Sequence, residues 1–133
     1  MATPATDRVP QSPGETPDNK VVLDGYRAGK FLLGKCKDTG KLFHYPRHIS
    51  PFTLSSNVEF VEAKGTGEIY SYSVARGKAP FSVAYVKLDE GPIVLTNIIE
   101  CDLDALKVGQ KVKVKFVKSD AEDGAPVPQF VPA

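Results

Sequence analysis

The residues best suited by type and spacing to do chemistry lie in one stretch, CKDTGKLFHYPRHISPFT, from Cys36 to Thr53. Cysteine at positions 36, 39, 50 and 53 would form two CxxC pairs ten residues apart, the ligand pattern of a tetrahedral zinc ribbon. Three of these positions instead hold Thr39, Ser50 and Thr53. Hydroxyls are poor substitutes for the thiolates that bind structural zinc. We therefore expect no zinc, although the outline of a site is kept.

The same stretch leaves a rearranged metal site open. His44 and His48 are four residues apart, as two zinc ligands can be, and Cys36 and Asp38 lie nearby in sequence. Residues four apart share one face of an extended strand. Because the other arm supplies no CxxC pair, the sequence favours two histidines that are exposed or hydrogen-bonded, with the rearranged site as the alternative.

Catalytic motifs are sparse in the rest of the chain. The sequence has no GxSxG, no HExxH and no GxxxxGK[ST]. Cys36 or Cys101 could be a nucleophile if the fold brought a histidine close. Cys101 stands between Glu100 and Asp102, whose carboxylates disfavour a thiolate, so we expect it to be buried as a small hydrophobe. We expect neither a disulfide in a reducing compartment nor an independent enzyme.

Aromatic residues suggest another kind of site. Tyr70 and Tyr72 lie two apart in a strand-like run and should share a face, with Phe81 and Tyr85 shortly after them. Such aromatics on a small barrel can stack on single-stranded bases. The net charge is only +1, whereas nucleic-acid-binding domains are usually strongly basic. Core or interface roles are the commoner interpretation, and nucleic-acid binding is the alternative.

The helix and strands that must position these residues come after an N-terminal segment that is rich in proline. Residues 1–20 contain four prolines and almost no aliphatic side chains, which predicts a flexible tail, with an arm packed on the body or on a partner as the alternative. Residues 21–56 should hold a short helix at about 21–29, a strand FLLGKC, and a hairpin-and-loop module.

The region 57–133 reads as a series of strands. Its runs are rich in Val, Ile, Tyr and Phe and are separated by Gly, Pro, Asp or Asn. They are VEFVEAKG, TGEIYSYSVARG, PFSVAYVKLDEG, PIVLTNIIE and KVKVKFVKS, with a helical turn in DLDALKVG and a short last strand in PVPQF. Five main strands with one helical connection favour an OB-type barrel over an SH3-like barrel or a sandwich. The predicted fold is therefore mainly β: a short helix and a degenerate zinc-ribbon hairpin, then a five-stranded OB-fold barrel.

Bulk composition is that of an ordinary globular protein. The chain has 133 residues, of which 41% are hydrophobic and 25% charged. It shows no signal-peptide pattern, and no window approaches the roughly 18 apolar residues of a membrane span. We expect a cytoplasmic protein that does not associate with membranes.

Several motifs together resemble one known family. They are GKFLLGKCKDTGKLFHYPRHISPFT, GTGEIYSYSVAR, VAYVKLDEGPIVLTNIIECD, VGQKVKVKFV and a terminal PVPQFVPA. The likeness covers residues 22–133 and is to bacterial and archaeal acyl-CoA-associated proteins that join an N-terminal rubredoxin-like zinc ribbon to a C-terminal OB-fold. The family's cysteines fall at positions 36, 39, 50 and 53, while Pro46-Arg47 and Ser50-Pro51 still resemble its Pro-Arg and Cys-Pro pairs. The resemblance implies a ribbon that has lost its metal.

The resemblance also implies a function. The better understood members look like non-catalytic subunits that bind thiolase-like or hydratase-like enzymes and complete or bridge their acyl-CoA sites. The chain would then serve thiolytic, retro-aldol or acyl-condensing chemistry, with the catalytic residues on the partner. It would share a coenzyme A thioester with that partner and bind no cofactor alone.

Residue type suggests which side chains make these contacts. Large apolar groups with little core of their own are candidates for the partner interface. They are Phe43, Tyr45, Phe52, Tyr70 and Tyr72. Candidates for the phosphates of coenzyme A are Lys41, Arg47, Arg76 and Lys78, with ordinary solvated charge as the alternative.

Overall fold

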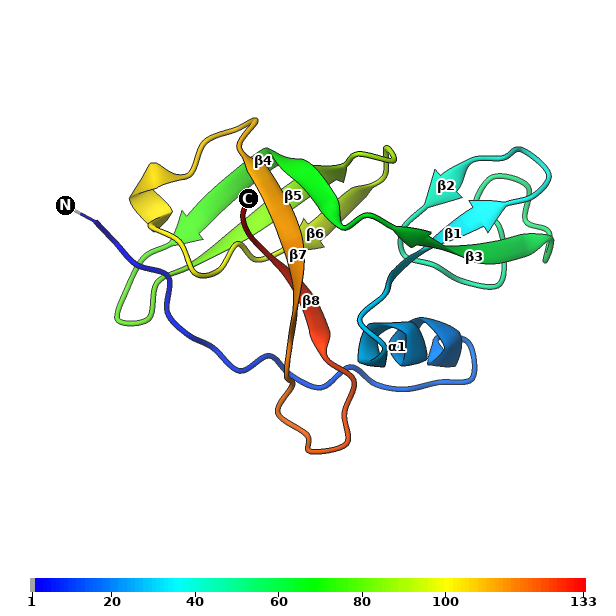
Figure 1. Ribbon diagram of the computed structural model, residues 1–133, viewed down its shortest axis with the longest axis horizontal. Helices are drawn as coiled ribbons and strands as arrows, with labels where there is room; N and C mark the ends of the chain where they lie inside the picture. Colours follow the sequence, from blue (N-terminus) through cyan, green and yellow to red (C-terminus); the bar gives the residue numbers. More distant parts are fainter. Residues whose placement is uncertain (1) are drawn as a thin grey trace.

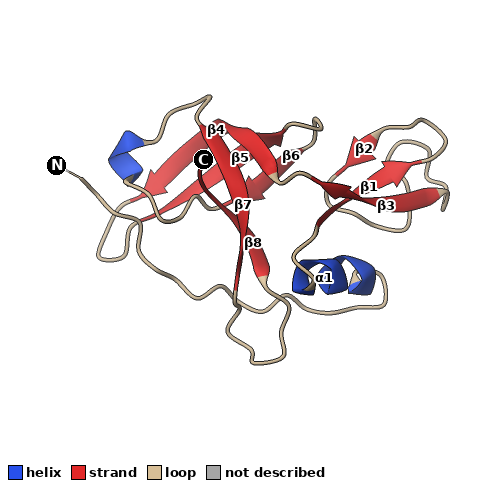
Figure 2. Cartoon of the chain, viewed as in Figure 1, coloured by secondary structure: helices blue, strands red, loops and turns tan. Residues whose placement is uncertain are grey.

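The computed structural model describes residues 2–133, which form one α-helix and two antiparallel sheets (Figures 1 and 2). A small sheet has the strand order β2-β1-β3, and a five-stranded sheet has the order β6-β5-β4-β7-β8. The elements are α1 (Lys20–Arg27), β1 (Phe31–Cys36), β2 (Leu42–Phe43), β3 (Val58–Ala63), β4 (Thr66–Ala75), β5 (Phe81–Leu88), β6 (Ile93–Thr96), the 3₁₀ turn η1 (Leu103–Ala105), β7 (Lys111–Val117) and β8 (Val127–Pro132). The predicted mainly β fold is confirmed.

The five-stranded sheet curls into a barrel. β4 pairs with β5 on one side and with β7 on the other, and β7 pairs with β8. A parallel bridge between Ile98, just beyond β6, and Phe130 of β8 joins the two outer strands. β4, β5 and β6 form an antiparallel meander. A parallel contact between the third and fifth strands of the barrel, β6 and β8, closes it, which is the OB-fold arrangement.

Side chains at alternate positions of the strands fill the interior of the barrel. In β5 the side chains of Ala84, Val86 and Leu88 are buried, while Val83 and Tyr85 between them are exposed. Alternate residues of a strand point to opposite faces, so one face of β5 lines the core and the other faces outward. β7 begins in the same way, with buried Val112 between exposed lysines, as the sequence predicts.

The small sheet and α1 pack against the barrel through aromatic rings. Phe31 of β1 meets Phe130 of β8 edge to face, with ring centroids 6.1 Å apart. Tyr26 of α1 contacts Phe31 at 6.2 Å and Phe116 of β7 at 5.6 Å. These rings form one hydrophobic core with the barrel interior, which fixes the loops of the small sheet relative to β6 and β8.

Two expectations about the elements need correction. The run Val58–Ala63, expected to open the barrel, pairs along its whole length with β1, and the fifth barrel strand is the terminal Val127–Pro132. Strand propensity marks a strand but does not name its partner, which explains the error. The helix spans Lys20–Arg27 rather than 21–29, because the chain turns at Gly29 with φ 78°.

The N-terminal segment is not a free tail in the described residues 2–20, so the packed-arm alternative applies. It lies along the barrel, and Pro4 forms a β-bridge with Asp102 (Figure 1). Its backbone bonds include Ala5 N to Cys101 O, Thr6 N to Pro80 O and Asp120 N to Pro10 O, each 3.0 Å long. Proline-rich sequence has little internal drive to order, but bonds to another segment can supply it.

Asp102 anchors both this segment and the 3₁₀ turn. Its Oδ1 accepts hydrogen bonds from Thr3 N at 2.8 Å and from Asp104 N at 3.1 Å. Replacing it with alanine removes a cap and a tether, and we expect a loss of about 1–2 kcal/mol in the free energy of unfolding. Urea denaturation would measure this loss, with Asp7→Ala, an exposed aspartate of the same segment, as the control. A loss equal to that of the control would contradict the anchoring role.

Candidate functional site

The four positions of the predicted metal outline do converge in space. Cys36 ends β1 and is fully buried, and its Sγ lies 3.8 Å from Thr53 Oγ1. Hydrogen bonds from the hydroxyl of Ser50, and then from that of Thr39, lower the pKa of the thiol to about 7. We call Cys36, Thr39, Ser50 and Thr53 the hydroxyl cluster.

A second layer of hydrogen bonds holds this cluster. The carboxylate of Asp38 accepts from Ser55 Oγ at 2.6 Å, from Asn57 Nδ2 at 2.8 Å and from Thr53 Oγ1 at 3.0 Å. These bonds, led by the one from Ser55, lower the pKa of Asp38. Ser50 Oγ accepts from the backbone N–H of Phe52 at 3.1 Å. Hydrogen bonds thus tie the loop after β1 to the loop that precedes β3.

The donor set of the hydroxyl cluster does not fit zinc. One thiol and three hydroxyls supply a single soft ligand, and all three hydroxyls are already bonded within the protein. The rearranged alternative does not assemble either, because the ring of His44 packs against Phe31 and that of His48 against Phe60. Within residues 2–133, no three or more His, Cys, Asp or Glu side chains come together as metal ligands would.

Neither cysteine is placed as a nucleophile. Cys36 has no exposed surface, so a substrate could not reach it. Burial, and then the charge of Asp102, raise the pKa of Cys101, whose Sγ donates to Ile98 O at 3.7 Å. The expectation that carboxylates disfavour a thiolate at position 101 agrees with this environment.

Exposed apolar side chains gather on the loop between β2 and β3. Tyr45, Ile49, Phe52 and Leu54 are 63%, 47%, 45% and 79% exposed, and we call them the loop patch. The structure thus places Tyr45 and Phe52 at the surface, as expected of interface candidates. Phe43 is different, because only 6% of it is exposed and its ring packs on Gly34, where a Cβ would lie 2.3 Å from the ring.

A second apolar surface covers the outer face of β5 and β6. It consists of Val83, Tyr85, Ile93 and Leu95, which are 37%, 48%, 42% and 47% exposed, and we call it the sheet patch. Tyr85 pairs directly with Leu95. Sequence reasoning missed three of the four. The signal was available in PFSVAYVKL and PIVLT, where the residues alternating with the core positions are also apolar.

An apolar slot of about 390 Å³ lies between the two patches. α1 lines it with Val22, Leu23 and Tyr26, the loop after β2 with His44 and Tyr45, and β6 with Leu95. Tyr45 belongs to the loop patch and Leu95 to the sheet patch, so the slot joins them into one surface. Burial raises the pKa of Tyr26 to about 12, so its hydroxyl stays protonated.

His44 is the group of this slot whose pKa is lowered by burial. Burial lowers its pKa from 6.5 to about 4, so the folded chain keeps the ring neutral while the unfolded chain protonates it first. The free energy of unfolding should therefore fall as pH drops from 6.5 to 4, by up to about 3 kcal/mol, and this loss should be complete below pH 4.

Denaturation at half-unit pH steps would test this prediction for His44. In the His44→Phe variant, the loss between pH 6.5 and 4.5 should largely disappear, because carboxylates with lowered pKa values act at lower pH. An unchanged slope in this variant would show that another group is responsible.

The four basic candidates do not lie together. Arg76 and Lys78 are in the β4–β5 loop, whereas Lys41 and Arg47 are in the small-sheet loops at the opposite end of the molecule (Figure 1). Arg76 is also paired with Asp104, with 2.8 Å between Nη2 and Oδ1. Side chains at the two ends cannot hold the phosphates of one coenzyme A molecule, so at most one pair can serve.

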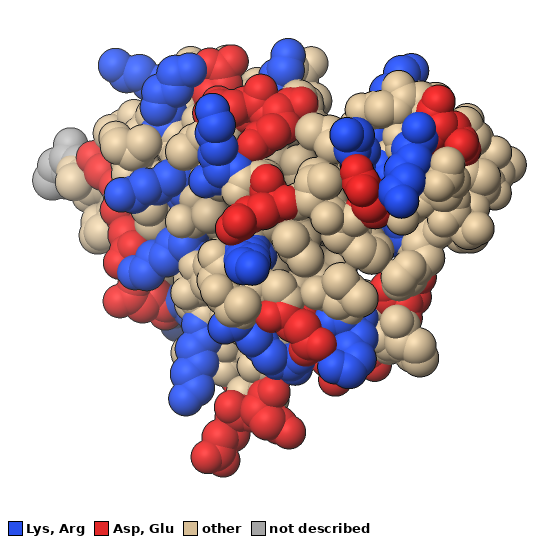
Figure 3. All heavy atoms as spheres, turned by 45° about the vertical axis from the view of Figure 1, so that its right-hand side comes forward, with Lys and Arg blue, Asp and Glu red and all other residues tan. Residues whose placement is uncertain are grey.

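The geometry does not favour a nucleic-acid groove. Acidic and basic side chains are interspersed on the face shown in Figure 3. Lys111 of β7 is paired with Glu68, and Lys115 with Glu100. The expected common face of Tyr70 and Tyr72 is interrupted, because a register shift lies between Ile69 and Ser71. Tyr72 donates from its hydroxyl to Leu106 O at 2.8 Å, a structural bond.

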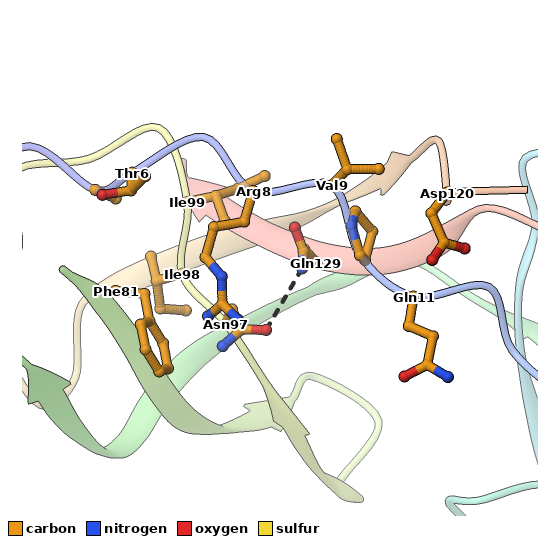
Figure 4. Close-up of a pocket in the computed structure, with 12 residues that line it drawn as sticks. Thr6, Arg8, Val9, Gln11, Phe81, Asn97, Ile98, Ile99, Asp120 and Gln129 are labelled. Carbon is orange, nitrogen blue, oxygen red and sulfur yellow. Dashed lines mark hydrogen bonds between the residues drawn. The ribbon is translucent and has the colours of Figure 1, made fainter. Parts of the chain in front are cut away.

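A second cavity, of about 460 Å³, lies beneath the N-terminal segment (Figure 4). The guanidinium of Arg8 sits 4.2 Å from the ring centroid of Phe81, and Gln129 Nε2 donates to Asn97 Oδ1 at 3.4 Å. This cavity is lined by the charged side chains of Arg8 and Asp120, whereas no charged side chain among the described residues lines the slot. Across residues 2–133, no helix has both the length and the apolar character needed to cross a membrane.

Comparison with known proteins identifies the class of the chain and then its family. A family model described as "ChsH2, C-terminal OB-fold domain" matches residues 60–117, which defines an OB-fold protein. A "DUF35 domain-containing scaffold protein" of Methanothermobacter thermautotrophicus is 35% identical over 100 residues, covering 68% of this chain and 75% of that protein. The chain belongs to the DUF35 family.

Two further relatives extend the comparison. The solved "Ltp2-ChsH2(DUF35) aldolase" superposes with a TM-score of 0.78 at 29% identity, covering 90% of this chain and 98% of that one. A "Probable enoyl-CoA hydratase alpha subunit" of Thermomonospora curvata is 30% identical over 141 residues, covering 98% of this chain. The match takes in 44% of that relative, so this chain spans less than half of its length.

Proposed function

We propose that the chain is a non-catalytic accessory subunit that binds a thiolase-like acyl-CoA enzyme and helps to complete its acyl-CoA site. The observation that carries the proposal is the apolar slot, which is lined by Tyr45 of the loop patch and by Leu95 of the sheet patch. Exposed apolar side chains that gather in patches often mark a protein interface. An aromatic such as Tyr85 at its centre suits an interface anchor.

The relatives support a role within an enzyme complex. One carries the word scaffold in its name, one is described as an Ltp2-ChsH2(DUF35) aldolase, and one as a probable enoyl-CoA hydratase alpha subunit. Aldol cleavage, hydration and thiolysis can all act on acyl thioesters. The proposal for this chain therefore places the catalytic residues on the partner and the docking surface here.

The loops of the small sheet are the proposed point of approach for coenzyme A. Lys41 and Arg47 lie beside the loop patch, and Lys41 Nζ is 5.3 Å from the ring centroid of Phe52. A cation held beside an aromatic ring at the edge of an interface can contact a phosphate from the partner's site. The proposal gives Arg76 and Lys78 no part in this contact.

Reconstitution tests the proposed function. The partner enzyme would be purified with and without this chain, and its thiolytic, retro-aldol and condensing activities would be measured with a set of acyl-CoA esters. We expect activity to fall at least about tenfold without the chain, and no turnover by the chain alone. Full activity of the partner by itself would contradict an accessory role.

A further inference from the structure

The slot differs from the other cavities in its charge. The cavity under the N-terminal segment is lined by Arg8 and Asp120, and a third cavity is lined by Glu100 and Lys115 among other charged residues. No Lys, Arg, Asp or Glu lines the slot within the described part of the chain. Because a buried charge without a counter-charge is costly, a group that enters the slot should be uncharged.

His44 is a buried polar group of the slot that lacks a partner. Both of its ring nitrogens are buried, and neither has a hydrogen-bond partner among residues 2–133. A buried polar atom without a partner costs roughly 1–3 kcal/mol, and a native structure normally avoids that cost. A neutral imidazole offers one donor and one acceptor, which suit a carbonyl or a hydroxyl.

The size of the slot limits the ligand further. Its volume of about 390 Å³ falls within the range of small-molecule sites, which are mostly apolar with a few polar groups. At about 30 Å³ for each water-sized group, it holds roughly a dozen heavy atoms. Helix α1, the loop after β2, β6, the start of β8 and Pro13 of the N-terminal segment all line it, so it is a concave site and not a flat face.

We propose that the slot binds an uncharged, mainly aliphatic molecule whose single carbonyl or hydroxyl hydrogen-bonds to His44 once the imidazole turns a ring nitrogen into the slot. The same chemistry is found in a free ketone or alcohol and in the acyl end of a thioester. This site belongs to the chain itself, so it does not depend on the proposed accessory function and can be tested on the isolated full-length chain.

The test is a titration of the ¹⁵N-labelled chain with 2-nonanone, followed by amide chemical shifts. We expect saturable shifts confined to α1, the loop after β2, β6 and the start of β8, and binding about tenfold weaker for His44→Phe, which keeps a ring but loses both nitrogens. Nonanoate, of similar size but charged, should bind more weakly than the ketone. A parallel titration with the octanoyl thioester of N-acetylcysteamine distinguishes the sources, because tighter binding than the ketone assigns an acyl thioester.

Two tryptophan variants on β6 provide the matched control. Leu95→Trp fills the slot and should abolish binding, whereas Ile93→Trp changes the same face of the same strand two residues away and should leave it intact. Both positions are exposed, so neither change disrupts the core. Shifts that never saturate, or that are equal in Leu95→Trp and the natural chain, would overturn the proposal whether or not the accessory function holds.

Discussion

A variant in which Thr39, Ser50 and Thr53 are replaced by cysteine should bind one zinc ion, whereas the natural chain should bind none. The three positions already surround the thiol of Cys36, so the backbone needs little rearrangement to present four thiolates. Structural zinc sites release about 10–16 kcal/mol on binding, which predicts an apparent Kd of about 50 nM or tighter. Metal analysis and the spectrum of the cobalt-substituted variant would measure stoichiometry and tetrahedral geometry.

Stability gives a second readout for this variant. Without metal it should be less stable than the natural chain, because it lacks the hydroxyl bonds of Ser50 and Thr53, and with zinc it should melt at a higher temperature. Thr39→Cys alone, which supplies two thiolates, is the control and should bind zinc weakly. Stoichiometric zinc in the natural chain, or none in the triple variant, would show that hydrogen bonds have not replaced a metal here.

The variant Tyr85→Asp should weaken binding of the partner enzyme by about a hundredfold or more. Tyr85 is 48% exposed at the centre of the sheet patch. An aspartate at this position would place an unpaired carboxylate in a desolvated interface. Its side chain faces outward, so the fold should tolerate the change. Calorimetric titration of the purified partner with each form of the chain would measure the effect.

Lys113→Glu is the matched control for Tyr85→Asp. Lys113 is exposed on β7, away from the sheet patch, and reversing its charge should leave partner binding unchanged. An oligonucleotide-binding protein would show the opposite behaviour. Replacing a lysine of β7 with glutamate would weaken its contacts with phosphates, so the affinity for the oligonucleotide would fall and would depend less on salt concentration. Loss of oligonucleotide affinity in Lys113→Glu, with partner binding unaffected by Tyr85→Asp, would contradict the proposed surface.

Local sequence patterns predicted most of the strands but not all of their pairings. Alternation in KVKVKFV gave both the strand and its buried Val112. The pairing of Val58–Ala63 with β1 was missed, because a strand's partner is fixed by the packing of distant residues such as Phe31 and Phe130. The sequence favoured a flexible tail over a packed N-terminal segment for the same reason. The backbone bonds that hold this segment are to residues about 75 to 110 positions away in the sequence.

The candidate site was predictable in part. The CxxC spacing singles out Cys36, Thr39, Ser50 and Thr53, and these four side chains do lie together in the structure. Residue type placed Tyr45 and Phe52 at the surface but failed for Phe43, whose burial depends on the space left by Gly34. The slot could not be foreseen, because it is formed by α1, the loop after β2, and β6 only after the chain has folded.

Affinity capture from the native lysate tests the accessory role most directly. The tagged natural chain and its Tyr85→Asp variant would be used in parallel, with protein, nucleic acid and metal measured in each eluate. The proposed function predicts an acyl-CoA enzyme at near-stoichiometric amount with the natural chain, and its loss with the variant. Recovery of nucleic acid, or of the chain alone with bound metal, would contradict it.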